Sequence, residues 1–164
     1  MELVFDTSVL IDLDNADILD TMVSLNNNLL FPALLEEEVG ERRFSILNEL
    51  NFTIIMLDLH ETIELKEIRK TNRRITLCDI SAFVIARNRR AILVTGDKKL
   101  RELAERNNVE VHGVLWLLDM LVMQEILHPM RVMTALKSIR EKGARLPDDD
   151  CQQFNRKWSR MIII

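Results

Sequence analysis

The chain has 164 residues, of which 48% are hydrophobic and 29% charged, and its formal net charge is −4 at pH 7. This length suits one domain with a substantial core, and the composition excludes a disordered or fibrous protein. The acidic balance excludes a global attraction to nucleic acid, so any such binding needs a local basic patch. Cys78 and Cys151 are too few for a disulfide framework and fit no metal-ligand spacing.

Nothing in the sequence predicts attachment to a membrane. No apolar run approaches the roughly 20 residues needed to cross a bilayer, and the N-terminus lacks the basic start of a signal peptide. We therefore expect a cytoplasmic protein. Residues 161–164 are apolar but too short for an anchor, and we expect them to pack on a partner or on the domain itself.

Short apolar runs alternate with helical patterns along most of the chain. The expected strands are 3–5, 29–31, 52–57, 91–95 and 109–111. The expected helices are 9–13, 18–23, 35–46, 58–70, 76–87, 98–106, 113–127, 132–139 and 147–158. This order predicts a three-layer α/β/α fold with a central parallel sheet of four to five strands over residues 1–127, followed by a helical C-terminal extension over 128–164.

Two of these strands end on an aspartate. Asp6 follows the first strand directly, and Asp97 follows the fourth after a Thr-Gly turn. Parallel strands end at the same edge of the sheet, which is where ligands bind in such folds. Either aspartate alone is equally consistent with an ordinary turn or a helix cap.

Two further acidic positions lie at the starts of expected helices. Asp79 follows the N-cap candidate Thr76, and Glu36, Glu37 and Glu38 form a run after Pro32. Early-helix positions lie over the carboxyl edge of the sheet, so these acids can join Asp6 and Asp97, although each also suits the helix dipole.

A cluster of these acids requires a cation or bound protons. Two carboxylates about 4 Å apart repel by roughly 4 kcal/mol at an effective dielectric constant near 20. Because no His or Cys accompanies the acids, the expected cation is Mg²⁺ or Mn²⁺ rather than Zn²⁺. Such sites commonly activate water for phosphodiester cleavage.

Four short motifs resemble those of PIN-domain nucleases. They are VFDTSVL at 4–10, PxxLxxEV at 32–39, LCDISA at 77–82 and LVTGDKKL at 93–100. The segment 103–115 resembles the closing β-α unit of that family, and GxRL at 143–146 also has a counterpart in a prokaryotic VapC-like subgroup with a helical tail.

The resemblance implies an acidic quartet for catalysis and metal binding: Asp6, Glu38, Asp79 and Asp97. Glu36 or Glu37 could replace Glu38, which is preferred because Leu35 and Val39 beside it face the core. Thr95 or Ser8 would be the accompanying polar residue. In this interpretation Asp6 and Asp97 hold one ion, and the other acids complete its shell, position a second ion or orient water.

The resemblance also implies an activity and partners. They are metal-dependent cleavage of single-stranded RNA, a role as the toxin of a type II toxin–antitoxin pair, a homodimer and a small antitoxin. Candidate RNA contacts are Arg73, Arg74, Lys98, Lys99 and Arg101. The apolar stretch 114–127, with nearby methionines, is a candidate for a dimer or antitoxin contact or for core packing. The alternative is a catalytically silent PIN-like binding or scaffold protein.

Overall fold

The computed structural model describes residues 1–162 and shows an α/β fold around one five-stranded parallel sheet. The strand order is β3-β2-β1-β4-β5. The strands are β1 (Glu2–Phe5), β2 (Asn28–Pro32), β3 (Thr53–Ile55), β4 (Ile92–Val94) and β5 (Val111–His112). The predicted fold class is therefore confirmed.

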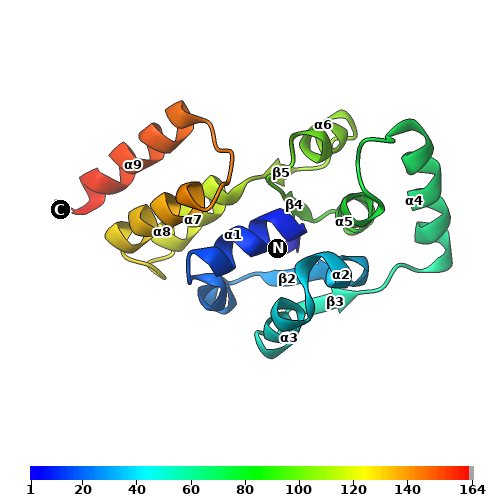
Figure 1. The fold of residues 1–164 in the computed structure, drawn as a ribbon, viewed down its shortest axis with the longest axis horizontal. Helices are drawn as coiled ribbons and strands as arrows, with labels where there is room; N and C mark the ends of the chain where they lie inside the picture. The colour runs from blue at the N-terminus through cyan, green and yellow to red at the C-terminus, as the bar shows by residue number, and fades with distance from the viewer. Residues whose placement is uncertain (163–164) are drawn as a thin grey trace.

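Helices cover both faces of the sheet (Figure 1). They are α1 (Thr7–Asn15), α2 (Glu36–Val39), α3 (Glu41–Glu49), α4 (Leu59–Thr71), α5 (Leu77–Arg89), α6 (Lys98–Arg106), α7 (Val114–Met123), α8 (Pro129–Glu141) and α9 (Asp148–Ile162), with 3-10 turns η1 (Leu19–Ser24) and η2 (Ala33–Leu35).

The core consists of two apolar clusters, one on each face of the sheet. Leu3 and Phe5 of β1 point into one cluster, whereas Val4 points into the other, as the two-residue period of a strand requires. The first cluster includes apolar residues of α1, α3, α7, α8 and α9, and the second includes those of α4, α5 and α6. Both faces of the central strands are thereby buried.

Strand β1 lies at the centre of the sheet and sets its register. Leu3 is opposite Leu29 of β2 and Ile92 of β4, and Phe5 is opposite Val94. The Asp6 amide extends this pairing by donating to the Val94 carbonyl at 3.1 Å. The chain segments that follow β1 and β4 therefore emerge side by side at the carboxyl edge.

The structure corrects several expected element boundaries. The helix expected over 35–46 is interrupted at Gly40, whose φ of +85° ends α2 and starts α3. The segment 18–23 forms a 3-10 turn, and the last strand lies at 111–112 rather than 109–111. The helix expected to reach residue 127 ends at Met123, and Glu125 has a φ of +57°.

The C-terminal helices share the core of the sheet domain. Fully buried Trp158 of α9 donates its indole Nε1–H to Asp119 Oδ1 of α7 at 3.0 Å, and Lys157 lies 2.6 Å from Asp119 Oδ2. Helices α8 and α9 stand at one end of the molecule and α4 at the other (Figure 1). The division of the chain at residue 127 stays a prediction.

Most of the apolar stretch 114–127 is core rather than surface, since most apolar side chains of α7 are buried and Trp116 and Met120 are half-buried. Met123 and Met130 stay exposed. Within residues 1–162, none of the helices is long and apolar enough to span a membrane. The expectation that residues 161–164 pack on a partner or the domain involves Ile163 and Ile164, which lie outside the described residues.

Candidate active site

Asp6 is the buried centre of the candidate site. It follows β1 immediately and caps α1, so its carboxylate is fixed at the boundary between strand and helix, with 1% of its surface exposed. Its Oδ1 accepts hydrogen bonds from Ser8 Oγ at 2.8 Å and the Val9 amide at 3.1 Å. Its Oδ2 accepts a hydrogen bond from the hydroxyl of Thr95.

The turn after β4 brings a second strand end against Asp6. Buried Thr95 contacts Asp6 with its hydroxyl, and its Oγ1 also accepts the Asp97 amide at 3.0 Å. Gly96 donates its amide to Ser8 Oγ at 3.2 Å, and a Cβ on Gly96 would lie 3.1 Å from that oxygen. Both polar residues predicted to accompany the acids, Ser8 and Thr95, therefore contact Asp6 directly.

Asp97 is the N-cap of α6 and remains exposed. Its Oδ1 accepts the Leu100 amide at 2.8 Å, which satisfies one of the free N–H groups at the start of the helix. The second carboxylate oxygen is not needed for this cap. The same residue can thus terminate the helix and offer an oxygen to a ligand.

Asp79 lies in the first turn of α5 and is partly buried. The Thr76 hydroxyl donates to Asp79 Oδ2 at 2.8 Å and accepts the Asp79 amide at 3.0 Å, so the capping residue also holds the carboxylate. Because α5 leads into β4 by way of Ala91, its first turn lies toward the carboxyl edge of the sheet.

Glu38 contacts the segment that carries Asp6. Its Oε2 accepts a hydrogen bond from the Thr7 hydroxyl at 3.2 Å, which joins the one-turn helix α2 to the start of α1. Glu36, Glu37 and Glu38 are all exposed, and Glu38 is bonded to Thr7, the residue next to Asp6. The geometry favours Glu38 as the glutamate of the site.

The pKa shifts of Asp6 and Asp79 link the four acids electrostatically by way of Asp79. Burial raises the pKa of Asp6 to about 6, against the lowering effect of its three hydrogen bonds, and the charge of Asp79 adds to the rise. Burial also raises the pKa of Asp79, and the charges of Glu38 and Asp97 add to it, whereas Thr76 opposes it.

Cys78 lies beside these acids, so the expectation that no Cys accompanies them is wrong. Its pKa is raised to about 12, first by burial and then by the neighbouring Glu38, Asp79 and Glu37, while its thiol donates to the Leu34 carbonyl at 3.2 Å. A thiol with this pKa stays protonated at neutral pH, so it is a poor nucleophile or metal ligand.

Asp12 is an acidic neighbour that sequence analysis missed. Its pKa is raised to about 6, first by burial and then by the charge of Asp6. The available signal was its place between Ile11 and Leu13, because an acid inside an apolar helical run is unusual. Thr7 and Thr76 were also missed as the residues that hold Glu38 and Asp79.

Within residues 1–162, no group of three or more His, Cys, Asp or Glu side chains is arranged to hold a metal ion. Each acid of the quartet is instead held by hydroxyl or amide donors, with Asp6 capping α1 and Asp97 capping α6. The donor set nevertheless fits a hard divalent cation, since it consists of carboxylate oxygens and neutral hydroxyls. The raised pKa values of Asp6 and Asp79 show that their negative charges are incompletely balanced.

The candidate RNA contacts divide into two groups. Arg73, Arg74 and Lys99 are exposed and line one cleft between α6 and the segment before α5. Lys98 is exposed on α6, 4.0 Å from Glu102. Arg101 is partly buried and donates to the Val111 carbonyl at 3.4 Å, so it supports β5 rather than facing that cleft.

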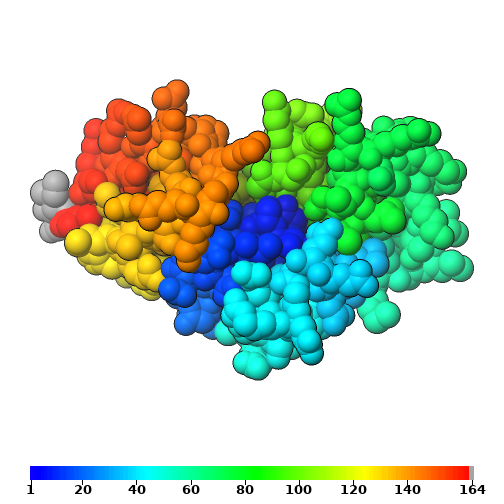
Figure 2. Space-filling model, in the orientation of Figure 1, coloured from blue at the N-terminus to red at the C-terminus, as the bar shows by residue number. Residues whose placement is uncertain are grey.

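The surface is indented where the N-terminal residues reach it (Figure 2). In that view the blue N-terminal segment lies between the cyan chain near residue 40 and the green chain of α5 and α6. Of the four acids, Glu38 and Asp97 are exposed and Asp79 is partly exposed, whereas Asp6 is buried.

A family model described as a PIN domain matches residues 2–160, which is nearly the whole chain. The match includes all four acids and extends through most of α9. No curated protein matches the chain.

Proposed function

The chain belongs to the PIN-domain family, a family of nucleases, and we propose that it is a divalent-metal-dependent endoribonuclease that hydrolyses single-stranded RNA. The single observation that carries this proposal is the buried Asp6 carboxylate. It ends β1, contacts Thr95 at the end of β4 and lies within electrostatic range of Asp79. A carboxylate with a raised pKa beside other acids is typical of a cation-binding catalytic site.

Each acid has a distinct place in this proposal. Asp6 and Asp97, at the ends of neighbouring strands, would hold a cation between them, and Asp79 and Glu38 would complete its shell or orient the attacking water. When bound, Mg²⁺ or Mn²⁺ supplies positive charge that stabilises the reacting phosphate. The hydroxyls of Ser8 and Thr95 keep both oxygens of Asp6 in fixed positions.

The reaction that fits this arrangement is in-line attack of water on the phosphorus. The water loses a proton to a carboxylate such as Asp79, the bond from phosphorus to the 3′-oxygen breaks, and that oxygen takes a proton from solvent as it leaves. Because the bond to the 3′-oxygen is the one that breaks, the phosphate stays on the 5′-oxygen, and the products are a 5′-phosphate and a 3′-hydroxyl.

The biological role proposed here is that of a cytoplasmic toxin that acts as a homodimer and is silenced by a small antitoxin. Its support is the resemblance of the helical tail, with GxRL at 143–146, to a prokaryotic VapC-like subgroup of the family. Exposed Met123 and Met130, at the end of α7 and the start of α8, are the apolar residues that suit such a protein contact.

The activity is tested by incubating a labelled single-stranded RNA with the protein in Mn²⁺ or EDTA. We expect cleavage only with Mn²⁺, products with a 5′-phosphate, and loss of cleavage in Asp6→Asn with the fold retained. Undiminished cleavage by Asp6→Asn would reject the assignment. Absence of both cleavage and a Mn²⁺-induced rise in melting temperature would favour the catalytically silent binding protein instead.

A further inference from the structure

We propose that a basic cleft beside the acids binds the RNA backbone at phosphates away from the cleaved bond, an inference that rests on the proposed function. The basic cleft has a volume of about 460 Å³. Its charged lining consists of Lys70, Arg73, Arg74, Lys99 and Arg106, with Glu102 as its single acid. This concentration of positive charge stands out in a chain whose net charge is −4.

Three of these cations are available to an anion. Arg73, Arg74 and Lys99 are exposed, and in the described part of the chain none of them lies within 4.0 Å of a carboxylate. By contrast, Lys70 is paired with Glu67 at 2.6 Å, and Arg106 donates to Asn72 Oδ1 at 3.4 Å. Like charges that outnumber their counter-charges repel one another, and a polyanion relieves that repulsion.

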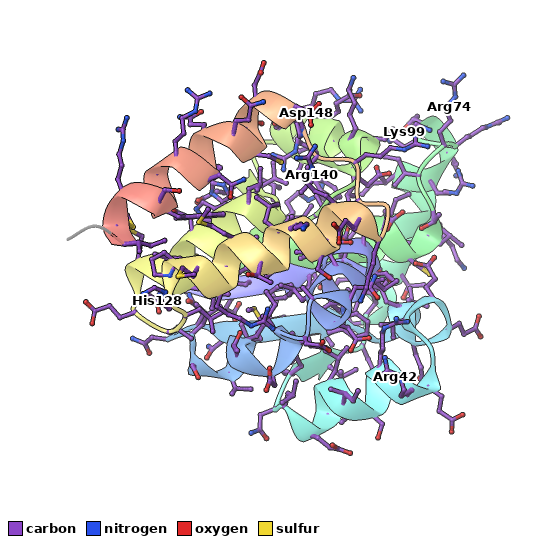
Figure 3. The ribbon with its side chains drawn as sticks, turned by 60° about the vertical axis from the view of Figure 1, so that its left-hand side comes forward. Arg42, Arg74, Lys99, His128, Arg140 and Asp148 are labelled. Atoms are coloured by element: carbon purple, nitrogen blue, oxygen red, sulfur yellow. The ribbon has the colours of Figure 1, made fainter. Side chains whose placement is uncertain are left out.

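The basic cleft is built from the same two segments that carry Asp79 and Asp97. Arg74 precedes buried Ile75, and the chain then turns into α5, whose first turn carries Asp79. On the other side, Lys99 follows two residues after Asp97. Arg74 and Lys99 lie near each other on one side of the molecule (Figure 3).

The basic cleft is long enough to contact more than one phosphate group. Arg106 is seven residues beyond Lys99 on α6, which is about 10 Å along the helix axis at 1.5 Å per residue. An RNA strand that places one phosphodiester at the acids can therefore run along α6 and bring adjacent phosphates to the cations.

The chemistry of the lining selects the phosphate backbone rather than the bases. No aromatic side chain is among the residues that line the basic cleft, so it offers no surface for base stacking. Guanidinium groups match phosphate oxygens in geometry and charge. The basic cleft should therefore increase affinity for single strands with little dependence on their sequence.

Binding is tested with the full chain carrying Asp6→Asn, so that RNA is not cut during the measurement. A labelled 20-nucleotide oligouridine is titrated by fluorescence anisotropy at several salt concentrations. We expect Arg73→Ala/Arg74→Ala/Lys99→Ala to raise Kd at least tenfold and to reduce the slope of log K against log salt by about 2, at roughly 0.7 per lost phosphate contact.

A matched control removes the same charge elsewhere. Lys137, Arg145 and Arg156 are exposed and lie on or between α8 and α9, so the triple substitution to Ala should leave RNA affinity unchanged. Wild-type affinity in the basic-cleft variant, or an equal loss in the control, would overturn the inference.

A small substrate separates this inference from the proposed function. Bis(p-nitrophenyl) phosphate is a phosphodiester too short to reach the basic cleft. We expect the triple basic-cleft substitution, in a chain that retains Asp6, to weaken cleavage of the 20-nucleotide RNA far more than hydrolysis of this small substrate. If the wild type hydrolyses neither substrate, the proposed function is rejected. If the basic-cleft variant loses activity equally on both substrates, the basic cleft is rejected as a separate binding site.

Discussion

Two opposed effects set the pKa of Asp6. Burial disfavours its charge, while Ser8, the Val9 amide and Thr95 donate hydrogen bonds that favour it. Burial dominates, and its pKa is raised to about 6. A cation that restores the charged form would therefore bind at a position where the protein itself leaves charge incompletely compensated.

The first prediction concerns stability without metal. The pKa of Asp6 is higher in the folded protein than in the unfolded chain, so its penalty is absent below about pH 4, grows as the pH rises, and is complete above pH 6. It then amounts to about 3 kcal/mol. Relative to wild type, Asp6→Asn should gain stability over this pH range in EDTA.

Denaturant unfolding between pH 4 and 8 measures this difference. Asp20→Asn, which removes an exposed carboxylate from η1, is the control, and Asp6→Asn should gain more stability than it does. If the unfolding free energies of wild type and Asp6→Asn differ by the same amount at every pH, then folding does not raise the pKa of Asp6.

The second prediction concerns Thr95, whose hydroxyl donates to Asp6 inside the core. Thr95→Val keeps the shape but removes the donor, and loss of a buried partner costs about 1–3 kcal/mol. We expect the pKa of Asp6 to rise further, so that the acid limb of the RNA-cleavage pH profile moves to higher pH. Thr95→Ser should retain the wild-type profile, and an unmoved profile in Thr95→Val would deny Thr95 this role.

At the scale of helices and strands, the acids occupy the places where elements begin. Asp6 caps α1 and Asp97 caps α6, so the same side chains that end strands also satisfy helix N–H groups. Asp58 caps α4 in the same way, in a capping box with Glu61, but it was not among the predicted site residues. Capping a helix is therefore not enough to identify a catalytic acid.

The third prediction compares two of these caps. Asn caps a helix about as well as Asp, so Asp97→Asn should change the unfolding free energy by less than about 0.5 kcal/mol. Its RNA cleavage should nevertheless fall by about 100-fold or more, because a charge at the reacting phosphate is lost. Asp58→Ala should do the reverse, with a loss of about 1 kcal/mol and unchanged cleavage. If Asp97→Asn cleaves RNA as well as the wild type, then Asp97 serves only as a helix cap.

The sequence predicts strand ends better than helix breaks. The end of β4 was predictable because a continuous apolar run stops at a Thr-Gly-Asp turn. The break at Gly40 was not, since one Gly inside a helical pattern costs only about 1 kcal/mol and often leaves the helix intact. Gly40 has a φ of +85° because α3 packs in a new direction, and the spacing of apolar residues in the sequence does not reveal that direction.

The partners of Glu38 and Asp12 depend on contacts distant in sequence. Thr7 and Glu38 are 31 residues apart and meet because α2 crosses the start of α1. Asp12 acquires its raised pKa from burial in the folded protein and from the charge of Asp6. Motif order placed the candidate acids at helix starts and strand ends, but only the folded chain shows which hydroxyl holds each one.

For the whole molecule, the C-terminal helices and the sheet share one apolar cluster that includes Leu3, Ile139 and Trp158. The fourth prediction follows from this shared core. Trp158→Ala should cost about 3–5 kcal/mol and leave a single unfolding transition, because α9 and the sheet lose stability together. The matched change Phe154→Ala, at a half-buried neighbour, should cost less. Two separate transitions in calorimetry would support independent units on either side of residue 127.

The four acids come from four separate segments of the chain, so a common function for them is a property of the whole fold. If they hold one divalent cation, Mn²⁺ at about 100 times its Kd should stabilise the protein by about 2.7 kcal/mol. For a domain of this size that corresponds to a rise in melting temperature of about 5–10 °C.

The most direct test is calorimetric titration of Mn²⁺ into the wild type and into Asp6→Asn, Asp79→Asn, Asp97→Asn and Glu38→Gln, with Asp58→Asn as a control. We predict binding to the wild type and the control, and at least tenfold weaker binding to each variant of the quartet. Wild-type Mn²⁺ affinity in Asp6→Asn and Asp97→Asn would contradict a shared cation site at the carboxyl edge of the sheet.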